Sequence, residues 1–117
     1  MVEIEGMIFN HLVSVLIDPS SNLSYIAPKA VDKCKLQPWK QTKPWLVQLA
    51  TGTKIKVVEA IPTCQLMLGE FLTQAPLNVL PLGSYDLLIG MDWLAAHKDK
   101  LDYYHKTLEL WAKKEKG

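Results

Sequence analysis

The stretch that decides the fold is Val13-Ser14-Val15-Leu16-Ile17-Asp18-Pro19-Ser20-Ser21-Asn22-Leu23-Ser24-Tyr25-Ile26. Its apolar, β-branched first part predicts a buried strand that ends at one carboxylate, Asp18. The Pro and Ser residues that follow predict a tight turn. Because a buried carboxylate without partners is costly, Asp18 either accepts hydrogen bonds from the turn backbone or takes part in chemistry. The stretch by itself leaves both interpretations open.

A second apolar strand ends in a comparable way further along the chain, in Tyr85-Asp86-Leu87-Leu88-Ile89-Gly90-Met91-Asp92-Trp93-Leu94. Gly90 breaks this strand, and residues 91–97 predict a helix with apolar side chains on one side. In this order and at this separation, the two motifs resemble the retropepsins encoded by gypsy-type long-terminal-repeat retrotransposons, especially those of plants. The resemblance covers residues 2–110.

The resemblance implies an all-β fold, a retropepsin-like closed β-barrel that forms half of an acid-protease molecule and has one short C-terminal helix. It also implies that the chain works as a two-fold homodimer. We expect the protease domain to span residues 1–112. Residues 113–117 are mostly charged and predict a disordered tail.

Composition limits the class of protein. A chain of 117 residues that is 49% hydrophobic predicts one globular domain. Thirteen basic and twelve acidic residues give a net charge of +1, which argues against a nucleic-acid partner. The longest apolar runs are strand-length, so we expect no membrane span, and residues 1–5 do not resemble a signal peptide. We therefore expect an intracellular, cytoplasmic protein, located within retroelement particles if it is part of a polyprotein.

The chain carries only two cysteines and three histidines. Cys34 and Cys64 are too few and too far apart for a zinc site, and we expect them to be buried thiols. His11, His97 and His105 lack the spacing of metal ligands. We therefore expect no metal site and no cofactor.

Apolar periodicity and turn residues predict the order of the elements. Residues 2–5 and 11–17 predict a hairpin connected through residues 7–9, and Pro28 begins a short helix over residues 29–34. Residues 36–44 predict a loop, because their two prolines rule out a central strand. The remaining predicted strands are residues 45–49, 54–61, 64–68, 71–75, 77–80 and 85–89, with a closing hairpin over residues 101–110.

Residues 45–61 predict a long hairpin with Ala50, Thr51, Gly52 and Thr53 at its tip. The resemblance implies that this hairpin is the flap, which covers the bound substrate. The local sequence fits an ordinary surface hairpin equally well, because lysines alternate with apolar residues along its second strand.

The resemblance also implies the chemistry. Aspartic proteases use two carboxylates that share one proton: one acts as a base toward water while the other, protonated, polarises the peptide carbonyl. This chain offers one such residue, Asp18, so activity requires two copies related by a two-fold axis. The implied partners are therefore a second copy of the chain and an extended polypeptide substrate, with no nucleic acid and no membrane.

The active-site loop departs from the family signature of Asp, then Thr or Ser, then Gly. Here Asp18 is followed by Pro19, Ser20 and Ser21. In the family the hydroxyl after the Asp bonds across the dimer to its twin loop, and Pro19 has neither a hydroxyl nor an N–H. The N–H of Ser20 can still donate to the carboxylate, and either serine hydroxyl could replace part of the missing bond.

Three hypotheses remain open on the sequence. The first is a homodimeric aspartic endopeptidase of a retroelement polyprotein. The second is the same fold with weak or no activity, acting as a dimerisation or peptide-binding module. The third is an unrelated small β-barrel in which Asp18 is only a turn residue. In all three, we interpret Asp92 as an acid in the first turn of a helix, favourable to the helix dipole.

Overall fold

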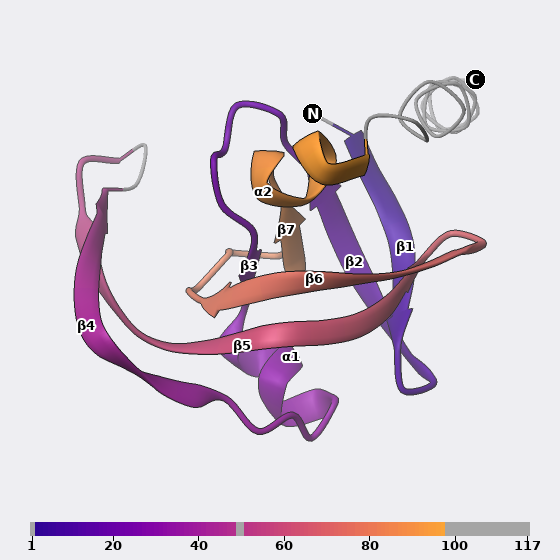
Figure 1. The fold of residues 1–117 in the computed structure, drawn as a ribbon, viewed down its shortest axis with the longest axis horizontal. Helices are drawn as coiled ribbons and strands as arrows, with labels where there is room; N and C mark the ends of the chain where they lie inside the picture. Colours follow the sequence, from indigo (N-terminus) through magenta and orange to yellow (C-terminus); the bar gives the residue numbers. More distant parts are fainter. Residues whose placement is uncertain (1, 49–50, 98–117) are drawn as a thin grey trace.

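The computed structural model describes residues 2–48 and 51–97, and Figure 1 shows their arrangement. In this part of the chain there are seven strands, two short helices and one 3-10 turn. Their bounds are β1 Val2–Ile8, β2 His11–Ile17, β3 Tyr25–Ile26, α1 Pro28–Lys33, β4 Trp39–Gln48, β5 Lys54–Leu68, β6 Phe71–Val79, β7 Leu87–Ile89, α2 Met91–Leu94 and the 3-10 turn η1 Ala95–His97.

The strands form one sheet that closes on itself. Their order is β1-β2-β7-β3-β6-β5-β4, and β1 also pairs with β5 through Gly6 with Leu68 and Met7 with Met67. Six strands thus make a ring, and β4 extends from β5 as an edge strand. The prediction of an all-β closed barrel with a short C-terminal helix is confirmed.

The core fills the inside of this barrel. Alternate residues of β2 point inward, so that Val13, Val15 and Ile17 are buried while their neighbours are more exposed. The helix α1 begins at Pro28, which suits a first helical position, and buries Ala30 and Val31 against the barrel core. The short helix over residues 29–34 was therefore predicted almost correctly.

The two cysteines lie in this core as free thiols, as predicted. Each is 3% exposed, and both belong to the main apolar cluster. Burial raises the pKa of Cys64 to about 11, with a further contribution from Cys34. Burial also raises the pKa of the Cys34 thiol.

The first hairpin is longer than predicted. We expected residues 7–9 to connect two strands, but β1 continues to Ile8, and the turn is made by Phe9 and Asn10, whose φ angles are 48° and 69°. Gly6 lies inside the strand, where an added Cβ would come within 2.7 Å of the Met67 carbonyl oxygen. The glycine therefore permits the close approach of β1 to β5.

The predicted loop over residues 36–44 is wrong in its second part, because β4 begins at Trp39. The strand tolerates Pro44 because it lies at the edge of the sheet, and the pairing with β5 is interrupted between Lys40 and Trp45. The exclusion of a central strand holds.

Residues 54–68 and residues 71–79 were each predicted as two separate strands, but each forms one continuous strand. The strand β5 runs through Pro62, with an irregularity between Ile61 and Cys64, and β6 runs through Pro76.

The predicted helix over residues 91–97 appears as α2 followed by η1. The predicted hairpin over residues 101–110 and the tail 113–117 lie outside the described residues. Among the helices described, none is long and apolar enough to cross a membrane.

Candidate active site

Asp18 lies where the two sequence motifs meet. The strand β2 pairs in parallel with β7, and Asp18, directly after β2, donates its N–H to the Ile89 carbonyl at 2.9 Å. The parallel pairing brings the ends of both strands together, so the loop after β2 (residues 18–24) lies beside the start of α2 (Figure 1). The tertiary structure therefore joins two motifs that are far apart in the sequence.

The Asp18 carboxylate is half-buried and held on one side. Its Oδ1 accepts the Ser20 N–H at 2.9 Å and the Ser20 hydroxyl at 2.5 Å. The Asp18 carbonyl accepts the Ser21 N–H at 3.1 Å. Within residues 2–48 and 51–97, Oδ2 accepts no hydrogen bond. Asp18 therefore opens a tight turn and also presents one carboxylate oxygen.

The serine hydroxyls of this loop are used inside the chain. Ser20 donates to Asp18, and Ser21 donates to the Leu23 carbonyl oxygen at 2.7 Å. Pro19 is exposed and has no N–H. The sequence-based expectation that the Ser20 N–H donates to the carboxylate is confirmed.

Asp92 connects this loop to α2. Its two carboxylate oxygens accept the Ser24 N–H at 3.0 Å and the Ser24 hydroxyl at 2.5 Å. The Ser24 hydroxyl in turn accepts the Gly90 N–H at 2.9 Å. Asp92 does lie in the first turn of α2, but its carboxylate also orients the loop. Sequence reasoning missed this role, because Ser24 and Asp92 are 68 positions apart and no local pattern links them.

Backbone contacts complete this attachment. The N–H groups of Met91 and Asp92 donate to the carbonyls of Ser21 at 2.7 Å and Asn22 at 3.0 Å. A Cβ on Gly90 would come within 2.3 Å of the Leu23 carbonyl oxygen. Glycine is thus required here for a close approach as well as for ending the strand.

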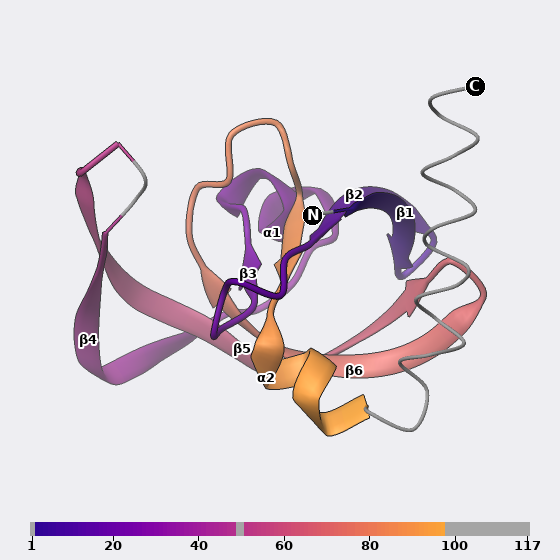
Figure 2. The same ribbon diagram turned by 90° about the horizontal axis from the view of Figure 1, so that it is seen from above.

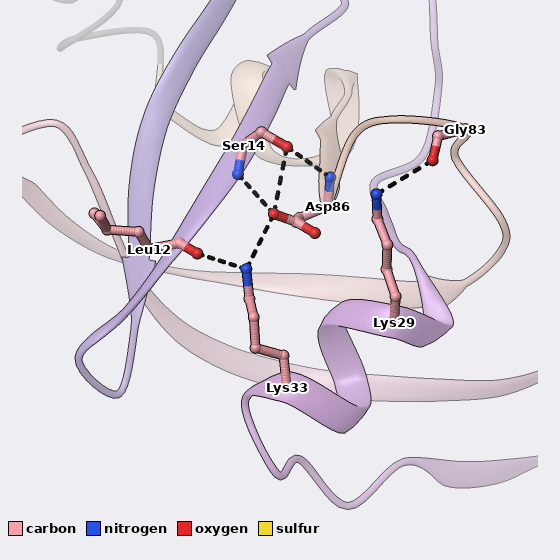
Figure 3. Close-up of polar contacts among 6 residues, drawn as sticks. All are labelled: Leu12, Ser14, Lys29, Lys33, Gly83 and Asp86. Carbon is pink, nitrogen blue, oxygen red and sulfur yellow. Dashed lines mark hydrogen bonds and ion pairs between the residues drawn. The ribbon is translucent and has the colours of Figure 1, made fainter.

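A second polar cluster, formed by Ser14, Lys33 and Asp86, supports β2 (Figure 3). The Asp86 side chain accepts the Ser14 N–H at 2.9 Å, and Lys33 lies 3.4 Å from the same carboxylate oxygen. The Lys33 ammonium also donates to the Leu12 carbonyl at 2.7 Å. Because β7 pairs with β2 only from Val15 onward, these two side chains satisfy backbone groups that the neighbouring strand leaves open.

The predicted flap is a hairpin of β4 and β5 that projects from the barrel, as Figures 1 and 2 show. At its tip Gly52 has a φ of 89°, and the Thr51 hydroxyl lies 3.2 Å from that of Thr53. Thr51, Gly52 and Thr53 are exposed. Ala50 lies outside the described residues.

The inner face of the hairpin joins an apolar cluster, which we call the flap cluster. Its buried members are Tyr25, Val57 and Leu80. The partly buried side chains packed against them are Leu23, Trp45, Val47, Ile55, Leu82 and Leu88. Because Leu23 and Tyr25 follow Asp18 closely, the cluster connects the base of the hairpin with the carboxylate loop.

No group of three or more His, Cys, Asp or Glu side chains that could hold a metal ion occurs among residues 2–48 and 51–97. Asp86 and Asp92 instead accept hydrogen bonds from Ser14 and Ser24, and the two cysteines are buried as free thiols.

The comparison with family models now identifies the fold family. Residues 1–116 match the retroviral aspartyl protease family. The chain belongs to this family. Asp18 follows β2 in a retroviral aspartyl protease domain, and the β4–β5 hairpin is part of the same domain.

Curated relatives of this protease domain occur in a fungus. The chain is 27% identical over 109 residues to DNA damage-inducible protein 1 from two strains of Cryptococcus neoformans var. neoformans serotype D. The match covers 93% of this chain and 24% of each relative, so the chain spans about a quarter of their length.

A solved structure supports the fold. The retroviral protease-like domain of Ddi1 from Leishmania major aligns with a TM-score of 0.67 and 20% identity, over 84% of this chain and 78% of that domain. The retropepsin-like fold is thereby confirmed. The predicted residues Asp18, Pro19, Ser20 and Ser21 share one loop, while the hairpin tip stands on a separate element.

Proposed function

We propose that this protease domain is a homodimeric aspartic endopeptidase in which each of two copies contributes Asp18. The observation that carries the proposal is the geometry of Asp18 at the end of β2. One carboxylate oxygen is held by Ser20, and the other accepts no hydrogen bond from the described residues. A carboxylate held in this way is oriented and can still accept or share a proton.

The reaction needs both copies. Two Asp18 carboxylates at a two-fold axis share one proton, since like charges a few ångströms apart cannot both ionise. The ionised member removes a proton from water, which attacks the peptide carbonyl, while the protonated member donates a hydrogen bond to the carbonyl oxygen. Because the reaction needs one ionised and one protonated member, cleavage should have a bell-shaped pH profile.

The substrate is an extended polypeptide that lies between the hairpin and the loop. The tip residues Ala50, Thr51, Gly52 and Thr53 cover it, and strand-like backbone pairing aligns it. The positive φ of Gly52 supports this role, because glycine at the tip allows the backbone to approach a bound chain.

The resemblance of the two motifs to gypsy-type elements supports a more specific setting. In this proposal the domain processes a retroelement Gag-Pol polyprotein of plant type, in the cytoplasm or within the particle. The protease domain then occupies residues 1–112 of this chain.

A second candidate function is the same fold with weak or no activity, acting as a dimerisation or peptide-binding module. The observation that favours it is the use of both loop hydroxyls within the chain: Ser20 donates to Asp18 and Ser21 to Leu23. Neither hydroxyl, as oriented here, supplies the bond that the family makes across the dimer.

The test is cleavage of a mixed peptide library at several protein concentrations, between about pH 4 and 7, beside an Asp18→Asn variant. The proposal expects cleavage that rises more steeply than linearly with protein and vanishes in the variant. Cleavage that persists in Asp18→Asn overturns it. A folded dimer that binds peptides without cutting them supports the second function instead.

A further inference from the structure

The side chain of Tyr25 is enclosed in the flap cluster. Tyr25 belongs to β3, where it pairs with Leu88 of β7 and Asn78 of β6. Its exposed fraction is only 9%, and its buried neighbours are Val57 from the hairpin and Leu80 from the end of β6. The ring thus lies between the carboxylate loop and the base of the proposed flap.

The Tyr25 hydroxyl has no partner in this setting. Among residues 2–48 and 51–97 no side chain or backbone group forms a hydrogen bond with it. A buried tyrosine usually finds a partner for its O–H, because an unsatisfied polar group in an apolar site lowers stability. Among the other cluster members only Trp45 carries a polar group on its side chain, the indole N–H, and the remaining side chains are aliphatic.

On this basis, and resting on the proposed function, we infer that Tyr25 is a specificity-determining residue whose hydroxyl donates to a neutral acceptor side chain of the peptide substrate, of the asparagine or glutamine type. A substrate side chain that enters the cluster from the peptide between hairpin and loop would meet this hydroxyl. An amide oxygen would satisfy it, whereas an aliphatic side chain would leave it unpaired.

The charge of the surroundings selects against an acidic side chain. The Tyr25 phenol is protonated at neutral pH, as tyrosine ordinarily is, and acts as a donor. Burial raises its pKa, and the Asp92 carboxylate raises it further. The same Asp92 carboxylate repels a second negative charge, and the side chains that line the cluster are apolar apart from Tyr25 and Trp45. A neutral acceptor is therefore preferred to a carboxylate.

The test compares peptide binding to the Asp18→Asn protein and to the double variant Asp18→Asn, Tyr25→Phe. The peptides carry Asn, Leu or Asp in turn at each position, since Asn and Leu have nearly the same shape. We expect a preference for Asn over both others at one position. Tyr25→Phe should reduce the ratio of Asn to Leu binding there by about three- to tenfold, leaving the other positions unchanged.

Two controls separate this role from a structural one. Tyr85→Phe removes a phenol hydroxyl outside the flap cluster and should leave the preference unchanged. The melting temperature of Tyr25→Phe should equal or exceed that of the parent, because the lost hydroxyl has no partner in the described structure.

The outcomes distinguish the inference from the proposed function. If peptides bind and Tyr25→Phe keeps the same preference, or if it lowers the melting temperature, the inference is overturned while the proposed function stands. If the dimer neither binds nor cleaves any peptide, the proposed function fails, and the inference falls with it.

Discussion

At the scale of single residues, Ser20 is the residue that orients the Asp18 carboxylate. Ser20 contributes its N–H and its hydroxyl to the same Asp18 oxygen, at 2.9 and 2.5 Å. The family has glycine at this position, which lets two loops approach one another across the dimer. In this chain the hydroxyl supports the carboxylate, and in the proposed dimer the Cβ that carries it would take up space between the two loops.

Replacing Ser20 should separate these two effects. Ser20→Gly removes both the hydroxyl and the Cβ but keeps the N–H bond, and we expect a gain in cleavage rate on the order of tenfold, since small displacements at a catalytic centre have large effects. Ser20→Ala removes only the hydroxyl and should give no such gain. Rates of peptide cleavage at saturating protein measure both, and equal rates for the two variants would contradict the explanation.

Cys64 provides a pH-dependent test of the core. Burial raises its pKa to about 11, so the folded protein keeps the thiol proton at a pH where the unfolded chain has lost it. Stability is therefore intact below about pH 9 and falls as the pH rises toward the folded pKa, by about 2 kcal/mol at pH 10.5. Urea unfolding of the parent and of Cys64→Ala at about pH 9 and about pH 10.5 gives the fall in the free energy of unfolding between them. This fall should be smaller in the variant. Parallel falls would contradict the assignment.

At the scale of elements, the edge of β2 shows how side chains take the place of a missing strand. Before Val15, β2 has no strand paired with it on the side where β7 lies. There the Asp86 carboxylate accepts the Ser14 N–H, and the Lys33 ammonium donates to the Leu12 carbonyl, as a neighbouring strand would do. The Ser14 hydroxyl accepts the Asp86 N–H at 3.0 Å, so each of the two residues donates its N–H to the side chain of the other. These contacts connect α1 with β2 and with the residue that precedes β7 (Figure 3).

The two members of this cluster should differ in their effect on stability. Asp86→Ala leaves the partly buried Ser14 N–H without its acceptor and should lower the free energy of unfolding by about 1–2 kcal/mol. Lys33→Met should cost about 1 kcal/mol or less, because the Lys33 side chain is 44% exposed and its ion pair is screened. Urea denaturation measures both changes. Asp32→Ala on the exposed side of α1 is the control, and a loss there as large as in Asp86→Ala would refute the interpretation.

At the scale of the whole molecule, the barrel carries one Asp18 loop, and the proposed dyad requires two barrels. The barrel closes through the β1–β5 pairing, while the β4–β5 hairpin projects from it. The catalytic proposal therefore depends on assembly, and activity should follow the composition of the dimer.

Mixing subunits tests this dependence. If wild-type and Asp18→Asn chains are unfolded together and refolded in equal amounts, only a quarter of random dimers contain two wild-type subunits, and activity per wild-type chain should fall to about half. Cleavage of one peptide, measured against wild type refolded alone, gives the ratio. Activity per wild-type chain that does not change would show that one Asp18 suffices, contrary to the proposal.

The sequence by itself predicted the strands, because strand-length apolar runs with period-two alternation bury one face wherever they occur. The closed barrel was implied by the resemblance to retropepsins. The run ending at Asp18, the run ending at Gly90, the short helix at Pro28 and the hairpin of residues 45–61 were predicted from local patterns. The burial of Cys34 and Cys64 was predicted from the number and spacing of the cysteines. The order and separation of the first two motifs indicated a retropepsin, and the comparison with family models confirmed the retroviral aspartyl protease family. The origin in a gypsy-type element of plants stays a prediction.

Only the tertiary structure decided what depends on contacts between distant residues. The continuation of β5 through Pro62 and the edge position of β4 follow from which neighbours pair with them, and no local pattern encodes those neighbours. The bonds of Asp92 to Ser24 and the enclosure of Tyr25 depend on the parallel pairing of β2 with β7 and on the β4–β5 hairpin. The sequence provides the side chains, and closure of the barrel determines which of them meet.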